Sequence, residues 1–184
     1  MRDLYLIRHG QSEGNVDPSV YYTKLDSEIE LTTLGKKQAF ECGQILSETL
    51  GDSPEIYFSP YRRAYETANL IAKQFKYATL EECDLLRERT WGYLREIVDS
   101  GHKTDNHFKF FYRPFGGESF ADAHARAILF LNKLRARPRS SPVIIVSHGE
   151  WIRVALMHIN KLTIAEFEER RKNPYNCQII KAQF

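Results

Sequence analysis

Two histidines and a pair of arginines have the residue types that phosphoryl transfer requires. His9 directly follows Arg8, His148 lies far along the chain, and Arg62 and Arg63 lie between them. Guanidinium groups match the geometry of phosphate oxygens, and an unprotonated imidazole nitrogen can attack phosphorus. Nearby positive charge lowers the pKa of a histidine and stabilises a transferring phosphoryl group. The residue types therefore predict a local phosphoryl-binding cluster that needs no metal ion.

The elements that must position this cluster alternate along the chain. Short apolar runs read as strands, and longer segments carry apolar residues at helical spacing. This alternation predicts an α/β fold, a three-layer sandwich with a mostly parallel central sheet flanked by helices. The expected strands are Leu4–Ile7, Glu55–Ser59, Pro142–Ser147 and Cys177–Lys181, and the expected helices are Leu34–Leu50, Tyr61–Lys76, Ala121–Arg137 and Trp151–Met157.

The carboxyl ends of three expected strands bring the candidate residues together. Ligands of open α/β sheets bind beyond the carboxyl ends of the strands. His9 follows the first strand, His148 follows the third, and Arg62 or Arg63 lies one turn into the helix after the second. The glycine after each histidine would let the backbone come close to a ligand. All of these residues are expected at one edge of the sheet.

Six ordered sequence blocks with compatible spacing cover nearly the whole chain. They are Arg8–Asn15, Leu31–Ala39, Ser59–Ala68, Leu86–Gly92, Gly116–Ser119 and Val146–Gly149. Together they resemble the motifs of the histidine phosphatase superfamily, in its phosphoglycerate-mutase-like branch. The resemblance implies a phosphoglycerate-mutase-like fold. The length predicts a single domain over residues 1–184.

The resemblance also implies a role for each matching side chain. His9 is the nucleophile that forms a phosphohistidine, and Arg8, Arg63 and His148 hold the phosphoryl oxygens. Glu88 gives a proton to the leaving alkoxide and then acts as the base for water, because bound phosphate can raise the pKa of a neighbouring carboxyl. No metal and no cofactor is expected. The expected substrate-binding residues are Arg8, Gln11, Asn15, Arg63 and His148.

Several alternatives stay open at this stage. Glu88 could instead pair with Arg87 or Arg89, as carboxylates near arginines often do. Substrate contacts from Val16–Glu30 are undefined, and Thr90–Phe115 is expected to form an abbreviated lid. A short lid admits water, so hydrolysis of a phosphomonoester is favoured. The alternatives are a cofactor-dependent phosphoglycerate mutase and, from another class, an inactive phosphate- or protein-binding module.

The bulk composition limits partners and location. The chain has 184 residues and 26 Lys and Arg against 24 Asp and Glu, so its net charge of +2 predicts no nucleic-acid or membrane partner. The expected partner is a small phosphorylated substrate or a phosphoprotein. The sequence shows no secretion signal and no apolar run of the roughly 18 residues that span a membrane. Three cysteines without a Cys-x-x-Cys pair predict a cytoplasmic location, whereas the oligomeric state has no sequence signal.

The other histidines and the aromatic residues are assigned less chemistry. His102, His107, His124 and His158 lack the clustering of metal ligands, so no chemistry is predicted for them. Most aromatic residues between the blocks are expected in the core. Some of Tyr21, Tyr22 and Trp91 are expected to line a pocket.

Overall fold

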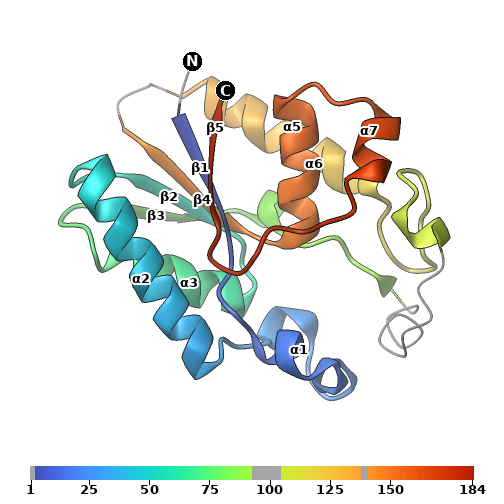
Figure 1. Cartoon of the computed structure of the whole chain (residues 1–184), viewed down its shortest axis with the longest axis horizontal. Coiled ribbons are helices and arrows are strands. Elements are labelled where there is room, and N and C mark those ends of the chain that lie inside the picture. The colour runs from blue at the N-terminus through green and yellow to red at the C-terminus, as the bar shows by residue number, and fades with distance from the viewer. Residues whose placement is uncertain (1–2, 93–104, 138–140) are drawn as a thin grey trace.

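One mixed, mostly parallel sheet organises the computed structural model (Figure 1). The structure describes residues 3–92, 105–137 and 141–184. The strand order is β3-β2-β4-β1-β5, in which the β1–β5 pair is antiparallel and the other pairs are parallel. The predicted sheet type is confirmed. The strands are β1 (Asp3–Arg8), β2 (Glu55–Phe58), β3 (Thr79–Glu82), β4 (Val143–Ser147) and β5 (Ile179–Gln183).

Helices cover both faces of the sheet and make the predicted three layers (Figure 1). Side chains alternate between the two faces, because successive strand residues point in opposite directions. Ile144 and Val146 of β4 pack in the cluster with α2 and α3, while Val143 and Ile145 pack in the cluster with α5 and α6. The helices are α1 (Glu13–Val16), α2 (Thr33–Leu50), α3 (Arg62–Ala72), α5 (Phe120–Arg135), α6 (Gly149–Ile159) and α7 (Ile164–Glu169).

Some elements differ from the sequence expectations. The strand β3 was not expected, because its four residues are all exposed and include two glutamates, so it lacks an apolar run. The last strand begins at Ile179 rather than Cys177, because Cys177 has a positive φ of 54°, outside the extended region. Of the expected lid, residues 93–104 lie outside the described residues, as does His102. Among the described helices, none has the length and apolar character that crossing a membrane requires.

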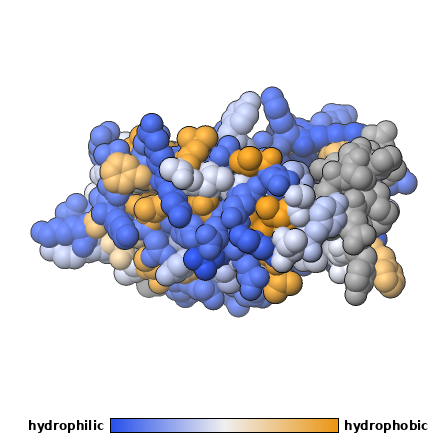
Figure 2. All heavy atoms as spheres, turned by 90° about the horizontal axis from the view of Figure 1, so that it is seen from below, coloured by the Kyte–Doolittle hydropathy of each residue, from blue (hydrophilic) through white to orange (hydrophobic). Residues whose placement is uncertain are grey.

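The carboxyl ends of β1, β2 and β4 meet at one edge of the sheet. The His9 amide donates to the Ser147 carbonyl at 2.9 Å, and the Ser59 amide donates to the Val146 carbonyl at 3.1 Å. Figure 2 views the molecule from this end and shows a mainly hydrophilic surface with separate apolar patches. Backbone hydrogen bonds therefore hold the three strand ends next to one another at a mainly hydrophilic surface.

The glycine after His9 serves the scaffold. A Cβ atom on Gly10 would lie 2.4 Å from the Gly35 carbonyl oxygen in the first turn of α2. The Gly10 amide donates to Thr67 Oγ1 in α3 at 3.0 Å. The sequence interpretation assigned this glycine to close approach of a ligand, whereas the close approach observed here is between two backbone segments of the chain.

Candidate active site

His9 carries an imidazole nitrogen that is free of a proton. The side chain is buried at the end of β1, with Nδ1 2.7 Å from the Gly10 carbonyl oxygen. Arg63 Nε donates to His9 Nε2 at 3.2 Å. Because an arginine can only donate, Nε2 is the acceptor, and the proton of the neutral ring lies on Nδ1. Burial, followed by the charges of Arg63 and Arg8, holds the pKa of His9 well below its usual value. The ring is therefore neutral, with the lone pair of Nε2 unprotonated.

Arg63 and Arg62 follow each other in the chain but have different surroundings. The Arg63 side chain is 4% exposed and contacts His9, and its Nη1 donates to the carbonyl and to Oδ1 of Asp26 at 2.6 and 2.9 Å. The Arg62 side chain is 55% exposed and pairs with Glu30 and Glu66. The helical register of α3 thus turns Arg63 toward the histidines and Arg62 toward the surface.

His148 lies beside His9 at the N-terminus of α6. The two ring centroids are 5.2 Å apart in an edge-to-face arrangement. His148 Nε2 lies 2.8 Å from Ser59 Oγ, and its buried Nδ1 has no hydrogen-bond partner among the described residues. Burial and the charge of Arg63 hold the pKa of His148 well below its usual value. Two neutral imidazoles therefore meet where β1 and β4 end.

Arg8 adds a second guanidinium at the same edge. Its Nη1 donates to the Pro174 carbonyl at 2.8 Å, whereas its buried Nε has no partner among the described residues. Burial lowers its pKa, and the charges of Glu88 and Arg63 act on it in opposite directions. Burial of a guanidinium donor without an acceptor costs free energy, which an anion within reach of Nε would recover.

The carboxylate of Glu88 lies at the N-terminus of α6 and, among the described residues, forms no ion pair with an arginine. Its Oε1 accepts from the amides of Arg89 and Trp151 at 3.0 and 3.1 Å, and its Oε2 accepts from the amide of Glu150 at 3.2 Å. Arg87 pairs instead with Asp84, and Arg89 pairs with Glu150. The open possibility of an arginine pair at Glu88 is thus not realised.

The environment of Glu88 suits a proton donor at neutral pH. Burial is the main cause, and the charge of Glu150 the second, of a rise in its pKa to about 7. The backbone amides of Arg89 and Glu150 and the charge of Arg63 oppose this rise, because they favour the charged form. The sequence interpretation attributed a raised pKa to bound phosphate, whereas burial and Glu150 already produce it here. A carboxyl with this pKa can both give and take a proton near pH 7.

A family model for the histidine phosphatase superfamily, branch 1, matches residues 4–184. The chain belongs to this superfamily. Phosphoglycerate mutase-like protein AT74 of Arabidopsis thaliana is 35% identical, with 96% of this chain and 63% of the relative covered. This chain therefore spans less than two thirds of that relative. A 2,3-bisphosphoglycerate-dependent phosphoglycerate mutase of Rhizobium etli is 32% identical over 90% of this chain and 84% of the relative.

Phosphatases also stand among the relatives of this histidine phosphatase chain. A metal-independent phosphoserine phosphatase of Arabidopsis thaliana is 27% identical, with 89% of this chain and 71% of the relative covered. A mycobacterial glucosyl-3-phosphoglycerate phosphatase, solved as a complex with VO3, has a TM-score of 0.80 at 24% identity, covering 98% of this chain and 90% of that one. The structural likeness confirms the phosphoglycerate-mutase-like fold.

In this histidine phosphatase chain, Gln11 and Asn15 bind neighbouring loops. Gln11 Oε1 accepts from Thr32 Oγ1 at 2.8 Å. Asn15 Oδ1 accepts from the Ser12 amide and from Asn176 Nδ2, both at 3.1 Å. Their oxygens therefore hold the loop after β1 in place. Direct contact of either residue with substrate stays a prediction.

The three aromatic residues proposed as pocket walls have different surroundings. Tyr21 packs on Gly14 and lies close enough to Arg8 that its ionised form raises the pKa of that guanidinium. Trp91 lies 4.0 Å from the Arg89 guanidinium, measured from its ring centroid to Cζ. Tyr22 is 56% exposed. Of the three, Tyr21 is thus the one that the structure brings near Arg8, whereas Trp91 packs on Arg89.

The sequence analysis assigned no role to three residues that contact the histidines or Arg63. Asp26 binds Arg63, Ser59 binds His148, and Asn176 Nδ2 donates to the His9 carbonyl at 2.9 Å. The position of Ser59 at a strand end was a usable signal. Asp26 and Asn176 come from irregular segments, for which periodicity predicts no position.

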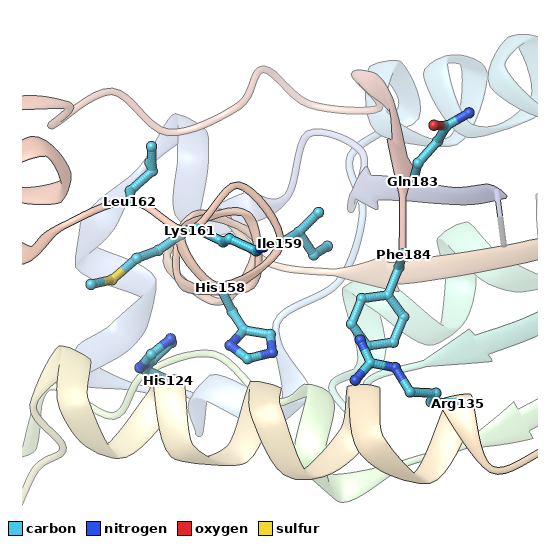
Figure 3. Close-up of a pocket in the computed structure, with 9 residues that line it drawn as sticks. His124, Arg135, His158, Ile159, Lys161, Leu162, Gln183 and Phe184 are labelled. Atoms are coloured by element: carbon cyan, nitrogen blue, oxygen red, sulfur yellow. The ribbon is translucent and has the colours of Figure 1, made fainter. Parts of the chain in front are cut away.

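A separate cavity of about 560 Å³ lies away from the histidine cluster. It is lined by residues of α5, of the C-terminal half of α6 and the turn after it, and of the end of β5, whereas His148 precedes the first residue of α6. Figure 3 shows the rings of His124 and His158 between α5 and the end of α6. Among the described residues, no group of three or more His, Cys, Asp or Glu side chains could hold a metal ion. Neither His9 nor His148 lines this cavity.

Proposed function

We propose that the protein is a phosphomonoester hydrolase that works through a phosphohistidine on His9. The observation that carries this proposal is the fixed tautomer of His9, whose Nε2 lone pair faces the guanidinium of Arg63. A phosphoryl group bound between these two side chains would lie next to the nucleophilic Nε2 of His9, and the positive charge of Arg63 would stabilise its oxygens. Membership of the histidine phosphatase superfamily and the phosphatase relatives support the same reaction.

In the first step, His9 Nε2 attacks phosphorus and the bond to the leaving oxygen breaks. Arg8, Arg63 and His148 hold the phosphoryl oxygens, so that positive charge and donors surround the transferring group. Glu88 gives its proton to the departing alkoxide. Because its pKa is raised to about 7, a substantial fraction of Glu88 carries that proton at neutral pH.

In the second step, water attacks the phosphorus of the phosphohistidine. Glu88, now ionised, takes a proton from the water, and the bond from phosphorus to His9 Nε2 breaks. The products are inorganic phosphate and the original neutral histidine. Arg8 and Arg63 supply the positive charge that stabilises the transferring phosphoryl group. We therefore expect no metal ion and no cofactor to take part.

The substrate class follows from the same site. A small phosphorylated molecule is the first expectation, supported by the phosphoserine and glucosyl-3-phosphoglycerate named for its relatives, and a phosphoprotein is the alternative. The three cysteines are free thiols, which supports the cytoplasm as the location. A single domain and the lack of nucleic-acid or membrane partners stay predictions.

A phosphoglycerate mutase is the second candidate, favoured by the 32% identity to the Rhizobium enzyme. The experiment supplies 3-phosphoglycerate together with 2,3-bisphosphoglycerate and follows 2-phosphoglycerate and inorganic phosphate in one reaction. We expect phosphate release to exceed isomerisation greatly, because water reaches the phosphohistidine. Efficient isomerisation with negligible phosphate release would overturn the hydrolase proposal in favour of the mutase.

A binding module without turnover is the alternative from another class. Comparing alkyl and aryl phosphate esters with the wild type and with Glu88→Gln separates these readings. We expect the wild type to hydrolyse both, and the variant to lose most activity on the alkyl ester, whose leaving group needs the proton. No hydrolysis of any ester in a broad panel would favour the binding module, and equal losses on both esters would remove Glu88 from the acid role.

A further inference from the structure

Asp26 binds the guanidinium of Arg63 on the side away from its contact with His9. It lies in a short 3-10 helix, Asp26–Glu28, in the segment between α1 and α2. Arg63 Nη1 donates to the Asp26 carbonyl at 2.6 Å and to its Oδ1 at 2.9 Å, while Arg63 Nε donates to His9 Nε2. The backbone and the side chain of Asp26 thus hold the same nitrogen.

The segment that carries Asp26 is itself fastened to α3. The Ile29 side chain is fully buried. Glu30 pairs with Arg62 at 3.0 Å, and the Leu31 amide donates to Glu66 Oε2 at 3.0 Å. These contacts reach the same first turns of α3 that carry Arg63. The position of Asp26 relative to this arginine is therefore set by several independent contacts.

Because the guanidinium is planar, contacts at two of its nitrogens fix the orientation of the whole group. With Nη1 fixed by Asp26 and Nε directed at His9, the plane of the group is fixed, and the edge formed by Nε and Nη2 is directed toward the nucleophile. That edge can offer two parallel donors to phosphoryl oxygens. When a phosphoryl group enters, Nε can move its hydrogen bond from His9 to an oxygen, which frees the Nε2 lone pair for attack.

We propose that Asp26 is a positioning residue that holds the Arg63 guanidinium with its Nε and Nη2 edge toward the phosphoryl group. This proposal rests on the proposed function, because it assigns Arg63 to phosphoryl binding. A carboxylate near an anion site weakens attraction of the anion, so its presence needs a compensating gain. The gain is preorganisation, since a long side chain that is already oriented loses less freedom when substrate binds.

The test is a double-mutant cycle on an aryl phosphate, with Asp26→Ala, Arg63→Ala and the double variant. Asp26→Ala keeps the backbone carbonyl but loses Oδ1, so we expect kcat/KM to fall about tenfold, within the range for misplaced catalytic groups. In the Arg63→Ala background the same change should have no further effect, because its target is gone. Asp26→Asn keeps an oxygen acceptor and should restore most of the activity.

Glu28→Gln is the matched control, since it removes an exposed carboxylate from the same 3-10 helix. It should leave kcat/KM unchanged. Inhibition by orthovanadate, which resembles the five-coordinate transition state, should weaken more in Asp26→Ala than inhibition by inorganic phosphate. A purely structural role would lower the melting temperature and leave these two inhibition constants in their wild-type ratio.

The outcomes separate this inference from the proposed function. A wild type that neither hydrolyses the ester nor binds phosphate would defeat the proposed function itself. An active wild type with an equally active Asp26→Ala, or a tenfold loss that persists in the Arg63→Ala background, would overturn the positioning role alone. If Asp26→Ala fails to fold, Asp26→Ser, whose shorter side chain cannot reach Arg63 Nη1, and Asp26→Ser/Arg63→Ala complete the same cycle. A loss in that single variant that disappears in the double variant supports the inference.

Discussion

Replacing Glu88 with glutamine is expected to change the free energy of unfolding differently at two pH values. Relative to the wild type, the variant should be more stable at pH 8 than it is at pH 4.5. Glu88 is partly buried, and its folded-state pKa is raised from the ordinary 4.5 to about 7, mainly by burial and then by the charge of Glu150. The folded protein therefore binds this proton more tightly than the unfolded chain does. Stability from this group is present below about pH 4.5 and is lost as the pH rises to about 7.

The size of the effect follows from the two pKa values. Each pKa unit corresponds to about 1.4 kcal/mol, so the rise from 4.5 to about 7 is worth about 3 kcal/mol. Glutamine carries no charge at any of these pH values, so the variant does not lose this stability as the pH rises. Its amide group must face one of the three backbone N–H donors at Glu88, which costs stability, but that cost is the same at both pH values.

The assay is urea unfolding of the wild type and Glu88→Gln, followed by circular dichroism at pH 4.5 and pH 8. We expect the difference in unfolding free energy between the two proteins to shift by about 3 kcal/mol in favour of the variant at pH 8. Glu28→Gln, which removes an exposed carboxylate, is the control for the change in net charge. A difference that is the same at both pH values would refute the reasoning about burial at Glu88.

Three further predictions concern the neighbours of the histidines and the need for metal. Glu150→Gln removes the second cause of the raised pKa of Glu88, so the alkaline limb of the kcat/KM profile for an alkyl ester should move about one pH unit lower; a limb at its wild-type position would contradict this. Ser59→Ala removes the hydroxyl that holds His148 Nε2, and steady-state kinetics should show kcat reduced about tenfold, the value of one hydrogen bond of about 1.4 kcal/mol; an unchanged kcat would show that His148 needs no such support. Excess chelator should leave hydrolysis unchanged, because the arginines supply the positive charge, and a loss restored by a divalent metal would sink the metal-free mechanism.

The sequence could predict the frame of the site because that frame depends on local patterns. β1 and β4 are short apolar runs, and each is followed directly by a histidine. Once the strands are parallel and adjacent, His9 and His148 must meet at one edge. The helical register of α3 then decides which of two adjacent arginines points inward. The placement of the two histidines needs only periodicity and the topology of α/β sheets, whereas the choice of Arg63 over Arg62 came from the family resemblance.

The remaining parts of the site depend on contacts between distant segments. Asp26 reaches Arg63, and Asn176 reaches the His9 carbonyl, from irregular stretches that have no periodic signal. The pKa of Glu88 depends on its burial at the N-terminus of α6 and on the placement of Glu150. Burial and electrostatic interactions of this kind exist only once the chain has folded. Sequence reasoning therefore identified the candidate residues that the structure brings together, but not the side chains that orient them.

The most direct test of the account is a search for the phosphohistidine itself. The wild type is mixed with a phosphate-labelled monoester, quenched in alkali, where phosphohistidine survives, and digested for mass spectrometry. We predict one phosphoryl group on His9, and neither label nor turnover in a His9→Ala variant whose circular dichroism matches the wild type. Continued hydrolysis by His9→Ala, or a label on a residue other than His9, would contradict the account.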